Sequence, residues 1–254
     1  MAALASDPDR KVDPITAQML APRPDWALFL DIDGTLLDIA ERPDAVRVPA
    51  GLVKSLTRAS RWLGGALAVA SGRTLAEIDH LLAPLCLPCL AEHGAMIRFP
   101  DGGMAVAGQG RSVPARWRFE LHAAARDWAG VLVEEKAHGV AVHFRLAPER
   151  EAEVRALVDQ VVADDPRNFE VLPARMAFEI RHRSLTKALA VDRLMPCPPF
   201  LGRVPVFVGD DVTDEDGFRA ARAMGGLGLH VKEAFGGQPA QVRGWLETFA
   251  AKRR

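Results

Sequence analysis

The segment ALFLDIDGTLLD, from Ala27 to Asp38, decides the expected fold of this chain. An uninterrupted apolar run ends in two carboxylates one residue apart, Asp31 and Asp33, and a Gly34-Thr35 turn follows at once. A short, fully apolar run of this kind is typical of a strand that is buried on both faces of a parallel sheet. In such sheets ligands bind beyond the carboxyl ends of the strands, so the two aspartates stand where a functional site is expected.

The bulk composition bounds the class of protein. The chain has 254 residues, 49% of them hydrophobic and 26% charged, which is ordinary for one large or two modest globular domains. A formal charge of −1 gives no basic surface for nucleic acid or for an anionic membrane. No apolar run approaches the ~18 residues that span a bilayer. The first residues lack a secretory signal, so a cytoplasmic location is expected. A monomer that acts on a small-molecule sugar phosphate is also expected.

The pattern along the chain predicts a parallel core that is interrupted by an insert. Strands alternate with helices from Trp26 onward, and the same alternation returns after Ser184. The stretch between them reads as hairpins and helices, which favours an α+β unit with a partly antiparallel sheet. We therefore expect a Rossmann-like, doubly wound α/β core at 26–110 and 183–254, an inserted α+β cap domain at 111–182, and a flexible tail at 1–25. Helices are expected at 48–63 and from Ser184 to Met195.

Three cysteines, Cys86, Cys89 and Cys197, are too few for a disulfide framework. Cys86 and Cys89 form a CxxC pair, but one pair cannot complete a four-ligand zinc site. Buried structural thiols are the expected state.

Three predicted strands end in polar motifs. The first ends in Asp31-Ile32-Asp33-Gly34-Thr35, the second in Ser71-Gly72-Arg73, and a late strand in GDDVTD, from Gly209 to Asp214. If the sheet is parallel, all three motifs meet at one edge.

This combination suits a phosphoryl transfer that depends on Mg²⁺. Hard carboxylate and carbonyl oxygens from Asp31, Asp33 and Asp210 are suitable ligands for the ion. Spacing alone does not rank Asp211 and Asp214, and Asp214 is favoured as a further ligand or supporting group. Asp31 is placed to attack phosphorus, and Asp33 to protonate the leaving oxygen and then activate water.

Two further side chains fit the same chemistry. Ser71 is expected to hydrogen-bond the phosphoryl oxygens. Lys187, in the segment SLTKAL, brings positive charge to the nucleophile and to the phosphate.

Each motif also has a purely structural explanation. The first motif can be a turn with an Asx-type bond, and Ser71 can simply cap a helix. The late acidic run can be a helix start, and Lys187 a solvated lysine. The ordered combination is what favours a catalytic site.

The ordered motifs DxDGT, SGR, a lysine and GDDxTD resemble those of the haloacid dehalogenase superfamily of phosphohydrolases, from about Trp26 to Trp245. The resemblance implies a Rossmann-like core, Mg²⁺, Asp31 as nucleophile and Asp33 as general acid and base. The second aspartate favours a phosphatase over a dehalogenase.

The insert resembles the trehalose-6-phosphate phosphatase family in particular. The matching motifs are an E-x-K…H-[YF]-R hairpin, an E-I-[KR] strand and an HGA triplet, which hold Glu134, Lys136, His143, Phe144, Arg145, Glu179, Arg181, His93, Gly94 and Ala95. This resemblance implies a cap domain that recognises a disaccharide phosphate. The implied substrate contacts are Glu134, Lys136, His143, Arg145 and Glu179 in the cap, with Arg73 and His93 nearer the core.

Structural alternatives remain for these cap residues. Glu134, Lys136, His143 and Arg145 can form a solvated face with cross-strand pairs, and His143 and Arg145 can merely orient their neighbours. Glu179 lies in an apolar strand, where a buried carboxylate needs a partner.

The chain departs from the family pattern at Ser184, Ala188 and Met96, which leaves the loop around Lys187 and the substrate contacts open. The expected activity is hydrolysis of trehalose 6-phosphate. The alternatives are a phosphatase for sucrose 6-phosphate, a glucosylglycerol phosphate or mannosyl phosphoglycerate, and a non-catalytic sugar-phosphate sensor. The intact set Asp31, Asp33, Lys187 and Asp210 argues against the sensor.

Overall fold

The computed structural model describes residues 21–39, 46–107, 111–136, 138–174 and 176–249. Residues 1–20 of the predicted tail therefore lie outside the described residues. The chain forms two compact units: unit 1 combines Met1–Ala105 with Thr186–Arg254, and unit 2 is Val106–Leu185. The insert expected at 111–182 thus corresponds to a compact unit that begins five residues earlier and ends three residues later.

Unit 1 is built on a seven-stranded sheet in the order β11-β10-β1-β2-β3-β4-β5. The strands β11, β10, β1, β2 and β3 are parallel, whereas β4 runs antiparallel to β3. The strands are β1 Trp26–Leu30, β2 Leu67–Ala70, β3 Cys89–Ala91, β4 Met96–Arg98, β5 Met104–Val106, β10 Val204–Gly209 and β11 Leu227–His230.

Strand β1 lies between β10 and β2, and every residue of WALFL is buried, as expected for a strand covered on both faces. The chain proceeds from β1 to β2 and β3 on one side, and later from β10 to β11 on the other. The strand order therefore reverses between β1 and β10. Such a switch point creates a crevice at the carboxyl ends of the strands, where ligands bind.

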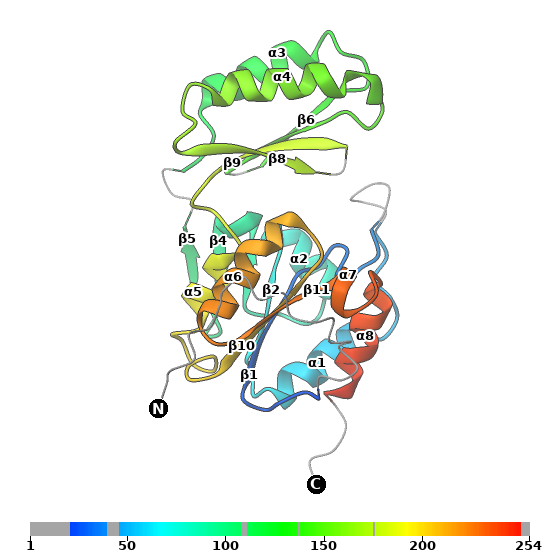
Figure 1. The fold of residues 1–254 in the computed structure, drawn as a ribbon, viewed down its shortest axis with the longest axis vertical. Helices are drawn as coiled ribbons and strands as arrows, with labels where there is room; N and C mark the ends of the chain where they lie inside the picture. The colour runs from blue at the N-terminus through cyan, green and yellow to red at the C-terminus, as the bar shows by residue number, and fades with distance from the viewer. Residues whose placement is uncertain (1–20, 40–45, 108–110, 137, 175, 250–254) are drawn as a thin grey trace, which may run out of the picture. The chain divides into compact units, whose positions relative to one another are not determined.

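Helices cover both faces of this sheet. Helices α5 and α6 pack against each other, as do α1 and α8, and Figure 1 shows the two pairs on opposite sides of β1 and β10. The helices of unit 1 are α1 Leu52–Trp62, α2 Leu75–Leu82, α5 Ala188–Leu194, α6 Glu215–Ala223, α7 Val231–Ala234 and α8 Pro239–Thr248, with single 3₁₀ turns at Glu92–Gly94 and Val212–Asp214. The predicted fold class, a Rossmann-like α/β core, is confirmed.

Several local predictions were wrong. The first helix begins at Leu52 rather than Val48, because Gly51 adopts a left-handed φ of 90° that ends the preceding loop. The helix expected from Ser184 begins only at Ala188, with Lys187 as its N-cap residue. All three cysteines are free, but only Cys89 is buried. Cys86 is exposed because it follows α2 in a surface loop, and Cys197 is half-buried.

Unit 2 has one apolar and one polar face on its sheet. The sheet is antiparallel, in the order β6-β7-β9-β8. Its elements are α3 Ala115–Ala125, β6 Leu132–Glu135, β7 Val140–His143, a 3₁₀ turn at Pro148–Arg150, α4 Glu151–Val162, β8 Phe169–Ala174 and β9 Ala177–His182. Both helices pack on one face of the sheet (Figure 1, green).

The alternation of side chains separates the two faces of the unit 2 sheet. Val140 and Val142 of β7 and Phe178 and Ile180 of β9 join a core that is centred on the fully buried Trp117 of α3. Because successive side chains in a strand point to opposite faces, Glu179 faces away from this core. The face opposite the helices is therefore the polar one.

No helix among the described residues combines the length and the apolar character needed to cross a bilayer.

Candidate active site

The three polar strand ends meet at the switch point of the unit 1 sheet. Leu30 of β1 is paired with Val208 of β10 and with Val69 of β2. The residue that follows β1, Asp31, is thus level with the ends of both neighbours, and its backbone N–H donates to the carbonyl of Val208 at 2.9 Å. Parallel register brings Ser71 and Asp210 to the same edge.

Asp31, Asp210 and Asp214 form a carboxylate cluster at this edge. One oxygen from each lies within 4.8 Å of the others, and the cluster would suit a metal ion. Asp31 and Asp214 are buried, at 4% and 0% exposed. The Asp214 carboxylate also accepts the backbone N–H groups of Asp210 and Asp211 at 3.0 Å each, which ties it to the end of β10.

Lys187 supplies the positive charge of the cluster. Its side chain is 3% exposed, and its Nζ donates to Asp31 at 2.7 Å and to Asp214 at 2.6 Å. The lysine reaches these partners from the N-terminal end of α5, 156 residues after Asp31. It is not the solvated helix lysine that its sequence context alone would favour.

The electrostatics of the cluster are unbalanced toward negative charge. Burial raises the pKa of Asp31 well above its ordinary value, against the opposing effect of Lys187. Burial, reinforced by repulsion from Asp214, raises the pKa of Asp210 to about 6. Burial alone would lower the pKa of Lys187, but the carboxylates of Asp214 and Asp31 outweigh it and raise the pKa. One ammonium therefore faces three carboxylates, and a bound cation would relieve the excess.

Gly34 brings the first loop close to Asp210. It has a φ of 76°, and a Cβ built on it would meet Asp210 Oδ2 at 1.9 Å. The next residue, Thr35, is fully buried and donates from Oγ1 to Asp210 Oδ1 at 3.4 Å. The role of Thr35 was not singled out from the sequence, although its place directly after the turn was the available signal.

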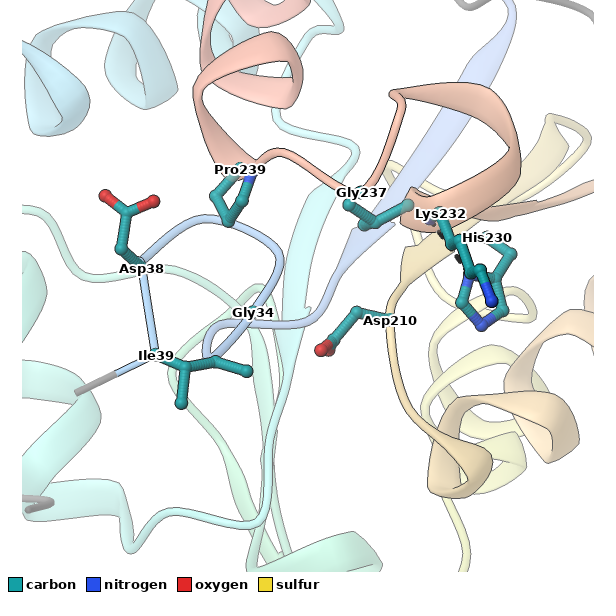
Figure 2. Close-up of a pocket in the computed structure, with 9 residues that line it drawn as sticks. Gly34, Asp38, Ile39, Asp210, His230, Lys232, Gly237 and Pro239 are labelled. Carbon is teal, nitrogen blue, oxygen red and sulfur yellow. Dashed lines mark hydrogen bonds between the residues drawn. The ribbon is translucent and has the colours of Figure 1, made fainter. Parts of the chain in front are cut away.

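A cavity of about 390 Å³ adjoins the cluster on the side of β11 (Figure 2). It lies between the loop after β1 and the segment from His230 to Pro239, and Asp210 lines it. His230 and Lys232, which also line it, were not predicted from the sequence. Their position at the end of β11, where His230 is the last strand residue and Lys232 follows two residues later, was the signal that could have found them.

The second motif binds the first through Arg73. Nε and Nη2 of Arg73 each donate to one oxygen of Asp33 at 2.6 Å, a bidentate pair. The backbone N–H of Arg73 donates to Ser71 Oγ at 3.2 Å, and Ser71 is 1% exposed. Asp33 and Arg73, which were predicted to act on the proton and on the substrate, are thus partners of each other.

His93 lies beside the second motif in an uncommon backbone conformation. Glu92 and His93 have φ values of 48° and 54°, in the left-handed region that non-glycine residues seldom adopt. The His93 N–H donates to the carbonyl of Ser71 at 3.1 Å. A Cβ on Gly72 would meet His93 Nε2 at 2.2 Å, so glycine is what allows the ring to approach. Strained backbone of this kind is frequent at functional sites.

The residues predicted in the insert lie in unit 2, mostly as pairs. Lys136 Nζ donates to Glu179 Oε2 at 2.7 Å, and both side chains are largely buried. Glu134 and His143 pair across the strands at 2.7 Å, and this bond lowers the pKa of Glu134. Arg145 follows β7 and is partly buried. The buried carboxylate of Glu179 therefore has the partner that its apolar strand required.

The doubly wound sheet and the carboxylate–lysine cluster at its switch point define an α/β protein with a candidate catalytic site beyond its strand ends. A haloacid dehalogenase-like hydrolase from Bacteroides thetaiotaomicron shares the fold, with a TM-score of 0.54 and 13% identity over 76% of this chain and 84% of that one. The trehalose-phosphatase family model matches residues 29–241, so the chain belongs to the trehalose-phosphatase family.

Curated relatives agree with this assignment. A probable trehalose-phosphate phosphatase from Sinorhizobium fredii is 43% identical over 89% of this chain and 88% of its own length. The trehalose-6-phosphate phosphatase of Escherichia coli is 32% identical over 81% and 77%. The C-terminal domain of the Candida albicans trehalose-6-phosphate phosphatase shares the fold, with a TM-score of 0.72 and 19% identity over 89% and 92%. The predicted family and enzyme class, a phosphoric monoester hydrolase, are confirmed.

Proposed function

We propose that this enzyme hydrolyses trehalose 6-phosphate to trehalose and phosphate through an aspartyl-phosphate on Asp31. The observation that best supports Asp31 as the nucleophile is its buried ion pair with Lys187 at the end of β1. A nucleophilic carboxylate must stay ionised beside an anionic phosphate, and a neighbouring ammonium favours that state. The names of the curated relatives support the choice of substrate. A monomer in the cytoplasm stays a prediction.

The two half-reactions need one group that moves a proton. In the first, an oxygen of Asp31 bonds to phosphorus while the bond from phosphorus to the sugar oxygen breaks, and Asp33 gives its proton to that oxygen. In the second, water attacks the phosphorus, Asp33 takes a proton from it, and the bond to Asp31 breaks. Ser71 and Lys187 stabilise the charge on the phosphoryl oxygens in both.

The donor set fits Mg²⁺. Three carboxylates whose oxygens lie within 4.8 Å offer the hard oxygen ligands that this ion prefers, and a single ammonium leaves them short of positive charge. We propose Asp31, Asp210 and Asp214 as the side chains that hold the ion, together with the backbone carbonyl of Asp33. When bound, Mg²⁺ neutralises phosphate charge and orients the phosphoryl group for in-line attack.

Removal of divalent cations is expected to reduce phosphate release by more than about 100-fold, because the excess carboxylate charge would then repel the phosphate. The measurement is phosphate release after dialysis against EDTA, followed by titration with MgCl₂. Recovery should be saturable with Mg²⁺. Full activity in excess chelator would contradict the role of the ion.

The polar face of the unit 2 sheet is proposed to bind the sugar. Glu134, Lys136 and Glu179 provide both acceptors and donors, which suits a ligand that presents many hydroxyl groups. His143 and Arg145 are proposed to support this set, since His143 already fixes Glu134 at 2.7 Å. His93 is proposed as a contact from unit 1.

Replacement of Glu179 by glutamine is expected to lower kcat/KM for trehalose 6-phosphate by about 10- to 100-fold, because a charged hydrogen bond to the sugar contributes about 1.5–3 kcal/mol. The same variant should keep its activity on 4-nitrophenyl phosphate within about threefold, since this substrate has no sugar to bind. Steady-state kinetics on both substrates gives the comparison.

Glu170→Gln is the matched control for Glu179→Gln. It breaks an ion pair to Arg181 of 3.1 Å between the neighbouring strands β8 and β9 of the same sheet, and it lies outside the proposed substrate contacts. Two results would place Glu179 outside substrate recognition. One is an equal loss of activity of Glu179→Gln on both substrates. The other is a loss in Glu170→Gln that is just as selective for trehalose 6-phosphate as the loss in Glu179→Gln.

The substrate is tested by phosphate release from trehalose 6-phosphate, sucrose 6-phosphate, glucose 6-phosphate and mannosyl phosphoglycerate in the presence of Mg²⁺. A kcat/KM at least about tenfold higher for trehalose 6-phosphate is the expected result, since each lost buried hydrogen bond costs at least that factor. An even spread or another preferred sugar would leave the aspartyl-phosphate chemistry in place and reject the proposed specificity.

A further inference from the structure

The guanidinium of Arg73 is largely buried and binds the carboxylate of Asp33. Its side chain is 11% exposed, and its two nitrogens Nε and Nη2 hold the two carboxylate oxygens of Asp33 at 2.6 Å each. Asp33 lies in the loop after β1, where its backbone forms an isolated bridge to Leu37. The bidentate pair fixes the plane of the carboxylate, which a single hydrogen bond would not do.

Arg73 is itself held from two directions. Its backbone N–H donates to Ser71 Oγ, and its Nη1 lies 3.8 Å from Glu77 Oε1. Glu77 is fixed in turn by a capping box, because its carboxylate accepts the backbone N–H and the hydroxyl of Thr74 at 2.8 and 2.7 Å. The start of α2 is therefore connected, through Arg73, to the general acid and base.

We propose that Arg73 is a positioning residue that orients the Asp33 side chain for proton transfer: the protonated carboxyl gives its proton to the leaving oxygen, and the resulting carboxylate takes one from the attacking water. This inference rests on the proposed function, and it gives Arg73 a role other than the predicted substrate contact. Glu77 supports the orientation of Asp33 indirectly, through its contact with Arg73.

The two half-reactions differ in their need for the Asp33 proton when the leaving group changes. A sugar alkoxide leaves only if Asp33 protonates it, whereas 4-nitrophenolate is stable enough to leave without a proton. Attack by Asp31 on 4-nitrophenyl phosphate therefore does not depend on the orientation of Asp33, but hydrolysis of the resulting aspartyl-phosphate does.

The experiment compares Arg73→Gln, Arg73→Lys, Asp33→Ala and the double variant Arg73→Gln/Asp33→Ala. Arg73→Gln is expected to lower kcat for trehalose 6-phosphate by about 10- to 100-fold, within the range that general acid–base catalysis contributes, with KM nearly unchanged. Rapid mixing with 4-nitrophenyl phosphate should still give a burst of one nitrophenolate per chain. Arg73→Lys should recover only part of the turnover, because an ammonium cannot hold both oxygens in one plane.

The double variant gives the decisive comparison. If Arg73 acts through Asp33, its replacement should cost no further activity once Asp33 is alanine, measured as the decay of the aspartyl-phosphate after the burst. Additive losses would overturn the proposal. A raised KM for trehalose 6-phosphate at unchanged kcat would also overturn it, and would return Arg73 to the substrate contacts.

Two further measurements separate the role of Arg73 from effects on folding and from the proposed function. Glu77→Gln retains the capping box and should lower the same kcat by no more than about fivefold, as an exposed ion pair is worth up to ~1 kcal/mol. A larger kcat loss in Glu77→Gln than in Arg73→Gln would contradict the inference that Glu77 acts on Asp33 only through Arg73. Failure of the unmodified enzyme to hydrolyse trehalose 6-phosphate would reject the proposed function alone, since the nitrophenolate burst and its decay still report on Arg73 and Asp33.

Discussion

Replacing Asp31 by asparagine is expected to lower phosphate release by at least about 10⁴-fold, both from trehalose 6-phosphate and from 4-nitrophenyl phosphate. An amide has no negative oxygen with which to attack phosphorus, so loss of the nucleophile affects every substrate equally. Phosphate release and acid-quench trapping of the phosphorylated chain are the two measurements. No phosphorylated Asp31→Asn chain should be found.

The fold should survive this change. Burial disfavours the charged form of Asp31, as its raised pKa indicates, and a neutral amide of the same shape avoids that cost while Lys187 keeps its bond to Asp214. We expect a Tm within about 5 °C of the unmodified enzyme, equivalent to ~1–2 kcal/mol.

Asp25→Asn is the matched control for Asp31→Asn. It changes the same residue type just before β1 rather than just after it, and its exposed side chain pairs only with Arg23 among the described side chains. This variant should retain activity within about twofold. Substantial turnover by Asp31→Asn would assign the nucleophile to another carboxylate of the cluster.

The sequence predicted the parts of the fold that follow from strand ends. Asp31, Ser71 and Asp210 each follow a short apolar run, and parallel register must bring such residues to one edge. The start of the first helix was less predictable, because glycine adopts either sign of φ and the sequence does not show that Gly51 takes the left-handed one. The position of Lys187 in the cluster rests on a contact between residues 156 apart, which no local pattern encodes.

The pairing of side chains was the least predictable feature of the site. Arg73 follows the second strand and Asp33 the first, and nothing in either motif indicates that they bind each other rather than a ligand. In unit 2 the partner of Glu179 could have been any nearby cation, and only the antiparallel register of β6, β7 and β9 brings Lys136 to it. Motifs therefore identified the residues, and tertiary contacts determined their partners.

Replacing Lys187 by methionine is expected to abolish turnover and to lower the free energy of unfolding by ~3–5 kcal/mol, the cost of leaving buried carboxylates without their partner. Methionine keeps most of the length of the side chain but removes the ammonium that Asp31 and Asp214 share. Urea denaturation gives the stability, and phosphate release gives the turnover. Lys54→Met, an exposed lysine on α1, is the control and should change stability by less than about 0.5 kcal/mol.

A second change should separate charge from packing in Lys187→Met. Adding Asp214→Asn removes one of the two carboxylates that lost their partner, so the double variant should regain part of the lost stability without regaining turnover. If the loss instead came from a poorly packed methionine, Asp214→Asn would not recover it. An unfolding free energy of Lys187→Met within about 1 kcal/mol of the unmodified enzyme would contradict the burial of an essential ion pair.

Mg²⁺ should stabilise Lys187→Met more than it stabilises the unmodified enzyme. A cation that binds only the folded state raises Tm according to its affinity, and three carboxylates without an ammonium attract a divalent ion more strongly than three carboxylates with one. The shift in Tm between EDTA and saturating MgCl₂ measures this directly. An equal shift in both proteins would mean that Lys187 and the ion do not share the same carboxylates. A larger shift in the variant would place the ammonium and the metal site on one common set of ligands, Asp31 and Asp214.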